Sequence, residues 1–438
     1  GDSLDSDDAL SAQNDITLTA TNDVVLDGPA TVMNADKGTV VITGKKITAT
    51  DLIDAQNDIT LTGTNDVAVE AVNSSDGSIT LSGTSVGASA TLDAGVNITL
   101  TGSNDAFTGD LDGAITAGGT VSLTDGKFDA TDVVITANKV VISGDTDLLG
   151  GKVKAESVLI TSTNDVTIDK LEELTAAEGA VVSGAAATGK INVTVDGDTA
   201  STGTITVVTG AGNDTITVTE DTKVNVSSGA GADIISVTDI AAGSVINAEG
   251  GDDVVTLTEI TTAYTVVGGE GNDTFDLSGG LITSATVDGG DGDADTVKIE
   301  GNNVGTGLNF KNIEVIEMTD ATTMTGASLA NDSTFELKGT ELFTVTTVDA
   351  GETVDLSAVT TSVLAPPTSI TIAGGSGADI ITGALNYDNT ITGGNGGGTL
   401  TGGNGTDGIT GGTGVDIIVG GGGTDTLTGL GGNDNLNG

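Results

Sequence analysis

The feature that most constrains this chain is a nine-residue repeat. Between Gly402 and Gly429 the sequence reads GGNGTDGITGGTGVDIIVGGGGTDTLTG, with an aspartate five places after the first glycine of each pair and an aliphatic residue two places later. One such nonapeptide buries a single aliphatic side chain, which contributes roughly 1.5–3 kcal/mol. Ordering its backbone costs about 1–2 kcal/mol per residue. Neighbouring repeats therefore have to stack, and something besides apolar burial has to hold the turns.

Longer repeats fill most of the remaining chain. The phrase AQNDITLTATNDVVL at 12–26 returns as AQNDITLTGTNDVAV at 55–69. Val, Ile, Leu and Thr alternate through these phrases, which is the period-2 pattern of half-buried strands. The predicted strands begin at Ile16, Val40, Ile59, Ile79 and Ile98, at intervals of 19 to 24 residues. Such an interval is typical of one coil of a parallel β-solenoid.

The type of repeat changes along the chain and predicts four segments. Residues 1–178 carry the strand repeats above, and residues 179–300 carry glycine loops with aspartates at 214, 233, 253, 273 and 295. Residues 301–370 keep the strand pattern without glycine loops, and residues 371–438, after the pair Pro366–Pro367, carry the nonapeptides. We expect an all-β chain, an elongated parallel β-solenoid in which a β-helix passes into a β-roll.

Charge limits the partners of this chain. It has 63 acidic residues against 13 lysines, no arginine and a formal net charge of −50. Nucleic acid and anionic membranes are bound through Lys and Arg, so we expect neither as a partner. No apolar run approaches the roughly 18 residues of a membrane span, so we expect no membrane insertion. Divalent cations are the expected partners.

The glycine–aspartate loops have the chemistry of a calcium site. Glycine permits positive φ, which turns carbonyl oxygens toward a common centre, and Ca²⁺ takes six to eight oxygen ligands at about 2.3–2.6 Å. Two nonapeptides make one 18-residue coil, so ions are expected between Asp407 and Asp425 and between Asp416 and Asp434. The predicted ligands are the carboxylates of Asp214, Asp233, Asp253, Asp273, Asp295, Asp379, Asp388, Asp407, Asp416, Asp425 and Asp434, with the carbonyls of Gly210, Gly212, Gly269, Gly271, Gly375, Gly377, Gly403, Gly405, Gly412, Gly414, Gly421 and Gly423.

Some repeats depart from the pattern. Gly398 stands where an aspartate is expected, which predicts a weak or missing ion at that loop. Glu249 stands where a first glycine is expected, and the repeats at 289–297 and 383–392 each carry one extra residue.

The repeats GGEGNDTF (268–275), GGSGADII (374–381), GGTGVDII (411–418) and GGGGTDTL (420–427) resemble those of the RTX family of secreted calcium-binding proteins. That resemblance implies several bound Ca²⁺ ions, folding triggered by calcium outside the cell, and type I secretion to the exterior or surface of a Gram-negative bacterium. The family's secretion signal follows its repeats, so further sequence is expected after Gly438. The strand repeats of residues 1–178 resemble filamentous-haemagglutinin repeats, and the combination resembles bacterial surface-layer and matrix proteins.

Features that could indicate an enzyme have simpler interpretations. GTSVG at 83–87 matches the G-x-S-x-G elbow of serine hydrolases, but the chain has no histidine to serve as the base. The carboxylates of Asp291, Asp293 and Asp295 could serve glycosidic chemistry, but the chain has eight aromatic residues and no arginine for a sugar cleft. Asn-Asp pairs at 22–23, 65–66, 104–105 and 164–165 fit a turn ladder better than cation sites. We expect no catalytic residue and no enzyme activity.

The sequence thus predicts an extracellular, calcium-dependent structural protein that self-assembles into a surface layer, a fibre or a matrix filament. Its expected partner is a further copy of itself, docked end to end, and cell-surface polysaccharide is a second partner that the sequence leaves open. The alternative is the stalk or a fragment of a secreted RTX adhesin.

Overall fold

Strands dominate the computed structural model, which divides into two compact units, unit 1 (residues 1–230) and unit 2 (residues 231–438). The described residues hold one 3-10 helix and no α-helix. They are residues 3–6, 9–27, 33–103, 109–130, 133–144, 146–149, 152–155, 157–172, 181–196, 204–219, 223–259, 263–279, 282–301, 304–330, 334–347, 351–361, 367 and 369–438. The Asn-Asp pair at 104–105 and Pro366 lie outside them.

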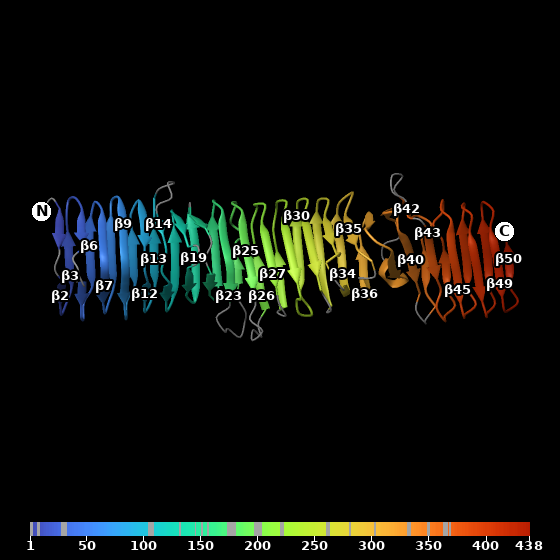
Figure 1. Ribbon diagram of the computed structural model, residues 1–438, viewed down its shortest axis with the longest axis horizontal. Coiled ribbons are helices and arrows are strands. Elements are labelled where there is room, and N and C mark those ends of the chain that lie inside the picture. The colour runs from blue at the N-terminus through green and yellow to red at the C-terminus, as the bar shows by residue number, and fades with distance from the viewer. Residues whose placement is uncertain are drawn as a thin grey trace. The chain divides into compact units, whose positions relative to one another are not determined.

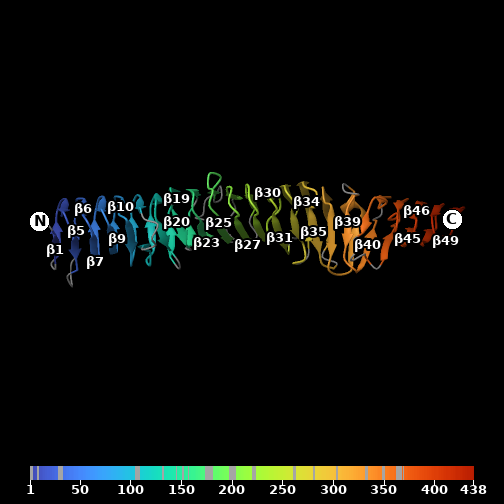
Figure 2. The same ribbon diagram turned by 90° about the horizontal axis from the view of Figure 1, so that it is seen from above.

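Each unit is a parallel β-solenoid, whose strands pair with the strands one coil before and one coil after (Figures 1 and 2). In unit 1 the predicted strand starts stack directly, because Ile16 pairs with Val40, Val40 with Ile59, Ile59 with Ile79, and Ile79 with Ile98. The prediction of an all-β parallel solenoid with coils of about 20 residues is therefore confirmed.

Unit 1 contains two sheets. The first sheet consists of β1 (Leu4–Ser6), β2 (Leu10–Ala12), β4 (Val24–Leu26), β5 (Met33–Ala35), β7 (Ile47–Ala55), β9 (Asp66–Ser74), β11 (Ser85–Ala88), β12 (Leu92–Ala94), β14 (Gly109–Asp110), β15 (Ile115–Ala117), β17 (Lys127–Asp129), β18 (Val134–Thr136), β20 (Asp147–Leu149), β21 (Lys152–Lys154), β23 (Val166–Glu172), β25 (Ile191–Asp196) and β27 (Thr215–Thr219). The second sheet consists of β3 (Ile16–Thr19), β6 (Val40–Gly44), β8 (Ile59–Gly63), β10 (Ile79–Ser82), β13 (Ile98–Thr101), β16 (Thr120–Thr124), β19 (Lys139–Gly144), β22 (Ser157–Ser162), β24 (Val181–Ser183), β26 (Thr204–Val208) and β28 (Lys223–Ser227).

The first sheet of unit 1 follows two tracks. The first half of β7 pairs with β4 and its second half with β5, and its register with β9 shifts between Ala49 and Leu52. Long strands such as β7 thus turn a corner, so the coils up to β23 have three sides. From β24 onward, one strand of each sheet alternates with one strand of the other.

Unit 2 contains four groups of strands. The first consists of β29 (Ile234–Thr238), β31 (Val254–Thr258), β33 (Thr274–Asp276), β35 (Thr296–Ile299), β37 (Val315–Met318), β39 (Glu336–Lys338) and β42 (Thr360–Thr361), and the second of β30 (Val245–Gly250), β32 (Tyr264–Glu270), β34 (Ile282–Asp291) and β36 (Val304–Lys311). The third consists of β38 (Thr322–Thr325), β40 (Leu342–Thr346), β43 (Ser369–Ala373), β45 (Asn389–Gly394), β47 (Gly408–Gly412) and β49 (Thr426–Leu430), and the fourth of β41 (Thr353–Asp355), β44 (Ile380–Thr382), β46 (Thr399–Gly403), β48 (Ile417–Gly421) and β50 (Asn435–Asn437). The 3-10 helix η1 (Gly326–Leu329) lies between the earlier and the later coils in sequence.

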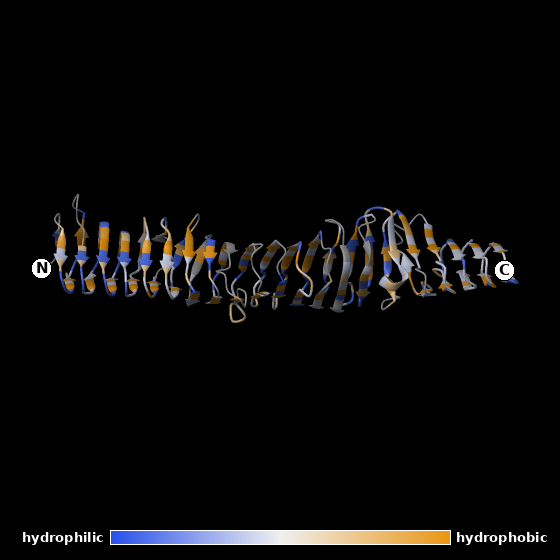
Figure 3. Ribbon diagram, turned by 90° about the horizontal axis from the view of Figure 1, so that it is seen from below, coloured by the Kyte–Doolittle hydropathy of each residue, from blue (hydrophilic) through white to orange (hydrophobic). Residues whose placement is uncertain are grey.

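The core is a thin column of aliphatic side chains inside the coils. Hydrophobic and hydrophilic residues alternate along most strands (Figure 3). Inward positions such as Ile59, Ile79 and Ile98 are fully buried and stack on one another, while threonine is common at the outward positions. Parallel pairing closes the ladder hydrogen bonds between coils and leaves the turns as the places where glycine and aspartate act.

Candidate cation sites in two kinds of aspartate ladder

In unit 2, carboxylates from successive coils form what we call the long-coil ladder: the buried Asp233, Asp253, Asp273 and Asp295, followed by the half-buried Glu314. Each carboxylate after Asp233 accepts a hydrogen bond from the backbone amide of the ladder residue one coil earlier. The N–O distances are 2.7 Å for Asp253 Oδ1, 2.9 Å for Asp273 Oδ1, 2.7 Å for Asp295 Oδ1 and 2.9 Å for Glu314 Oε2. The ladder therefore fixes one oxygen of each carboxylate against the neighbouring coil.

The second oxygen of these carboxylates is different. The Oδ2 atoms of Asp253, Asp273 and Asp295 are buried and have no hydrogen-bond partner in the part of the chain that the structure describes, and each of these side chains is at most 1% exposed. A buried acceptor without a partner costs roughly 1–3 kcal/mol, and more when it is charged. These oxygens therefore need either a proton or a cation.

Glycine leaves open the space beside two of these oxygens, those of Asp273 and Asp295. A Cβ built on Gly268 would collide with Oδ2 of Asp273 and with the carbonyl oxygen of Gly289, one coil later. A Cβ on Gly289 would likewise collide with Oδ2 of Asp295 and the carbonyl of Asn312. Carboxylate and carbonyl oxygens from two coils thus converge on the first glycine of these two loops, which is the hard-oxygen environment that Ca²⁺ prefers.

The electrostatics of the ladder also favour a cation. Burial raises the pKa of Asp253 to about 7, and the neighbouring carboxylates of Asp233 and Asp273 add to the rise. Burial likewise raises the pKa of Asp273 to about 6, and raises the pKa of Asp295 with a contribution from Glu314. Like charges repeated from coil to coil are costly unless positive charge lies among them.

The nonapeptide coils hold their aspartates in another way. Oδ1 of Asp425 accepts from the amide of Asp407 at 3.0 Å, and Oδ1 of Asp434 accepts from the amide of Asp416 at 3.1 Å. The structure thus brings together both predicted pairs. Oδ2 of Asp407 accepts from the amide of Gly403 at 2.7 Å, and Oδ2 of Asp416 accepts from the amide of Gly412 at 2.8 Å. In these nonapeptide ladders a carboxylate accepts hydrogen bonds both from its own loop and from the neighbouring coil.

Asparagine occupies one position of these ladders and shows what the loop can hold. Asn389 is 2% exposed and stands where other coils have aspartate. Its backbone amide donates to Oδ1 of Asp407 at 2.7 Å. Its side-chain Nδ2 donates to the carbonyls of Ala384 at 3.0 Å and Tyr387 at 2.8 Å and to Oδ1 of Asp407 at 2.9 Å. A positively polarised group thus lies among three oxygens. Where aspartate replaces asparagine, a cation could fill the same place.

The structure corrects the sequence analysis at two positions. The extra residue of 383–392 precedes Ala384, so Asn389 takes the ladder position, while Asp388 is exposed and accepts from the amide of Thr406. Glu249 pairs with Gly269, the second glycine of its loop and not the first, and has a positive φ of 71°. Gly398 does stand at a ladder position, where its amide donates to Asp416 Oδ1.

The other predicted carboxylates lie at comparable turns. In unit 1, Asp214 is 1% exposed, accepts from the amide of Ile191 at 2.7 Å, and has a pKa raised by burial. In unit 2, Asp379 is fully buried and accepts from Glu352, Thr347 and Gly375. Both oxygens of Asp379 therefore already have donors from the protein.

The predicted carbonyl ligands are at the turns, but some contribute to pairing between coils. The carbonyls of Gly210, Gly375, Gly403 and Gly412 accept amides from the next coil, which leaves one lone pair on each oxygen. Gly269, Gly271, Gly421 and Gly423 have positive φ. The carbonyls of Gly377, Gly405 and Gly414 lie against a glycine one coil later, and that of Gly212 belongs to the equivalent loop of unit 1.

Three kinds of residue were missed. Glu314 continues the long-coil spacing, 19 residues after Asp295. It lacks the glycine motif by which the other members of the ladder are recognised in the sequence. Asn389 was hidden by the extra residue. The carbonyl oxygens of first-position glycines, such as Gly289 and Gly420, face the same point as a carboxylate oxygen of the coil before, and only the coil stacking reveals this.

Within the described ranges, no three Asp, Glu, His or Cys side chains converge as a metal cluster. A cation in these loops would therefore use main-chain carbonyls beside its carboxylates. Comparison with family models, curated proteins and solved structures gave no match.

Two observations bear on the other functional classes. Asp295 is buried in the ladder, while Asp291 and Asp293 are exposed. Ser85 begins strand β11 and does not occupy a strand-to-helix elbow. Among the described residues, none of the helical structure is long and apolar enough to cross a membrane.

Proposed function

We propose that this chain is an extracellular structural protein of RTX type, whose solenoid coils are stabilised by calcium and which self-assembles into a surface layer, a fibre or a matrix filament. The observation that carries the calcium part is the set of buried Oδ2 atoms of Asp253, Asp273 and Asp295, which lack any hydrogen-bond donor. No enzyme activity is part of this proposal.

The proposed role of calcium follows from the long-coil ladder. An ion beside Oδ2 of Asp273 would draw on the carbonyl of Gly289, because both oxygens face the α-carbon of Gly268. Such an ion would neutralise buried charge and join one coil to the next. Occupancy at 100 times the dissociation constant stabilises a folded protein by about 2.7 kcal/mol for each site. Several sites would therefore decide whether the coils are folded.

The proposed self-assembly rests on charge and on the repetitive surface. A net charge of −50 makes copies repel each other in the absence of cations. Calcium can bridge exposed carboxylates from two copies, and the outward strand faces repeat at the coil spacing of about 4.8 Å. Calcium would then act twice, within the coils and between the molecules.

The test is a calcium titration of chelator-stripped protein, followed by far-UV circular dichroism and by light scattering. The proposal predicts that β-structure increases first and that polymer mass increases at higher calcium. Magnesium at the same ionic strength is the control, because its smaller octahedral shell fits carbonyl-rich loops poorly. Folding without polymer would support the adhesin stalk instead. If neither signal responds to calcium, the calcium role and the structural proposal both fail.

A further inference from the structure

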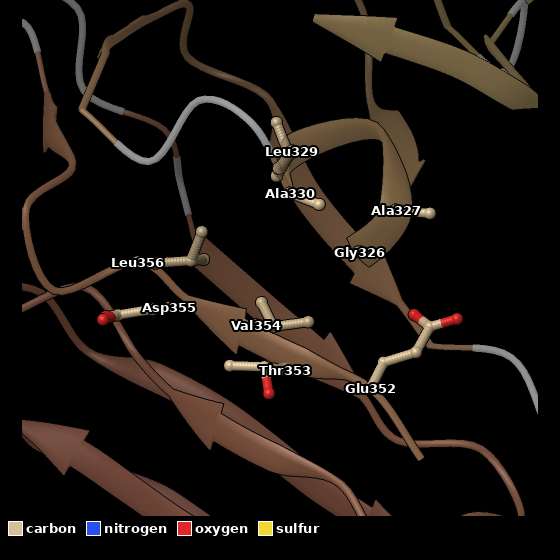
Figure 4. Close-up of a pocket in the computed structure, with 9 residues that line it drawn as sticks. All are labelled: Gly326, Ala327, Leu329, Ala330, Glu352, Thr353, Val354, Asp355 and Leu356. Carbon is tan, nitrogen blue, oxygen red and sulfur yellow. The ribbon is translucent and has the colours of Figure 1, made fainter. Parts of the chain in front are cut away.

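A cavity in unit 2 lies between η1 and β41 (Figure 4). Its volume is about 500 Å³, within the usual range for small-molecule sites. Its lining residues are Gly326, Ala327, Leu329, Ala330, Glu352, Thr353, Val354, Asp355 and Leu356. Leu329, Val354 and Leu356 are buried, while Ala327, Ala330 and Asp355 are exposed at the rim.

The cavity exists because regular stacking is interrupted at this point. Among the described strands β41 pairs only with β44, so its other edge faces η1 in place of a strand. Thr325 caps η1 by accepting from the amide of Ser328, which holds the short helix in place. Gly326 has no side chain, and a Cβ there would lie 2.7 Å from Cγ2 of Val354 and 3.0 Å from Oε2 of Glu352.

Glu352 gives the cavity its chemical character. Its Oε2 atom is buried and has no hydrogen-bond partner among the described residues, although its backbone amide donates to Asp379. In Figure 4 the carboxylate points toward η1, while Val354 lies between Glu352 and Asp355 along β41. Among the described residues that line the cavity there is no lysine, and the only charged groups are the carboxylates of Glu352 and Asp355.

We propose that this cavity binds a small organic cation, an alkylammonium ion, whose ammonium group donates to Oε2 of Glu352 and whose alkyl chain packs against Leu329, Val354 and Leu356. An anion would meet two carboxylates, and a sugar would find no aromatic platform among the lining residues. A metal ion would find one buried carboxylate oxygen, Oε2 of Glu352, while Asp355 lies at the exposed rim; calcium takes six to eight oxygens. An ammonium ion with an apolar body matches both the charge and the walls.

The experiment uses the full chain in saturating calcium, so that the ladders are equally loaded in every measurement. Binding of n-pentylammonium is measured by calorimetry and by ligand-observed NMR, against n-pentanol and pentanoate, which share its chain length. We expect pentylammonium to bind with a dissociation constant on the order of 1 mM. Pentanol should bind at least about tenfold more weakly, because it cannot make the charged hydrogen bond.

Glu352→Gln is the decisive variant and Asp355→Asn is its matched control. Glu352→Gln keeps the shape of the side chain and should weaken pentylammonium binding roughly tenfold or more. Asp355→Asn lies at the rim and should change it less than about threefold. Equal binding of pentanol and pentylammonium, unchanged binding by Glu352→Gln, or competition by further Ca²⁺ would each overturn the proposal. If Glu352→Gln fails to fold, the comparison of ligands on the unaltered chain still decides between these outcomes.

Discussion

The long-coil ladder and the nonapeptide ladders use the same residue at the same place in a turn, yet they satisfy it differently. Asp407 and Asp416 give both oxygens to backbone amides, one in their own loop and one in the neighbouring coil. Asp253 and Asp273 give one oxygen to an amide and keep the other buried without a donor. The repeat that matches the calcium motif best is therefore the less dependent on a cation for its internal hydrogen bonds.

Neutralising one carboxylate in each ladder should separate the two most strongly. Asp273→Asn removes a buried charge but keeps an acceptor, so chelated protein at pH 8 should gain about 1–3 kcal/mol in free energy of unfolding. Asp407→Asn should lower the free energy of unfolding by a similar amount. The Nδ2 of the new asparagine cannot accept a hydrogen bond, so the bond from Gly403 or the bond from Asn389 is lost. Chemical denaturation of both variants in chelator measures the two changes. The same sign in both variants would contradict the distinction.

Filling the space beside the ladder should also be costly. Gly268→Ala places a methyl group against Oδ2 of Asp273 and the carbonyl of Gly289, so we expect a loss of about 2–4 kcal/mol and weaker calcium binding. Gly408→Ala is the matched control in the nonapeptide coils, because a Cβ there meets nothing within 4 Å. It should be neutral or stabilising by up to about 1 kcal/mol. Thermal unfolding with and without calcium compares the two variants. An equal loss of stability in both would show that the space beside Oδ2 of Asp273 is not needed.

The pH dependence of chelated protein provides a third test. The folded pKa of Asp253, about 7, lies above its ordinary value of 3.8, so the folded state binds more protons than the unfolded state between these values. The free energy of unfolding should therefore fall as pH rises from 4 to 8, by about 2–4 kcal/mol for this group alone. Calcium should reduce or reverse the trend. A chelated protein that becomes more stable across this range would show that the ladder is not the dominant buried charge.

Replacing Asn389 by aspartate converts an internal donor into a cation ligand. Asn389→Asp sets a carboxylate against the carbonyls of Ala384 and Tyr387 and Oδ1 of Asp407. Without calcium we expect a loss of about 1–3 kcal/mol, and with calcium a recovery of most of it. Calorimetry should detect one additional calcium site. Destabilisation that calcium does not relieve would mean that the loop cannot hold an ion.

The smallest expected effect concerns the turn alone. Leu430 stands at the second-glycine position with a φ of 65°, a conformation that costs a residue with a side chain about 1–2 kcal/mol. Leu430→Gly should therefore stabilise the protein by about 0.5–1 kcal/mol, part of the gain being offset by the entropy of glycine in the unfolded chain. Denaturation curves resolve a change of this size. A clear loss of stability would show that packing of the leucine side chain stabilises the protein by more than its backbone conformation costs.

The sequence predicted most of the fold because periodicity sets coil length. The spacing from Ile16 to Ile98 fixed which strands stack, and the nine-residue period paired Asp407 with Asp425. It misplaced Asp388, because a ten-residue repeat does not reveal which of its residues is the extra one. The sequence also could not distinguish the long-coil ladder from the nonapeptide ladders. Whether Oδ2 meets an amide depends on the backbone path of each loop, and glycine permits both paths. The cavity at Glu352 arises where stacking is interrupted, which no repeat predicts.

The most direct test of the account is a crystal structure of the calcium-loaded chain, with anomalous data collected at a wavelength where calcium scatters strongly. The account predicts anomalous peaks about 2.3–2.6 Å from Oδ2 of Asp253, Asp273 and Asp295. A folded chain with no peak beside these three oxygens, in crystals grown with excess calcium, would contradict it.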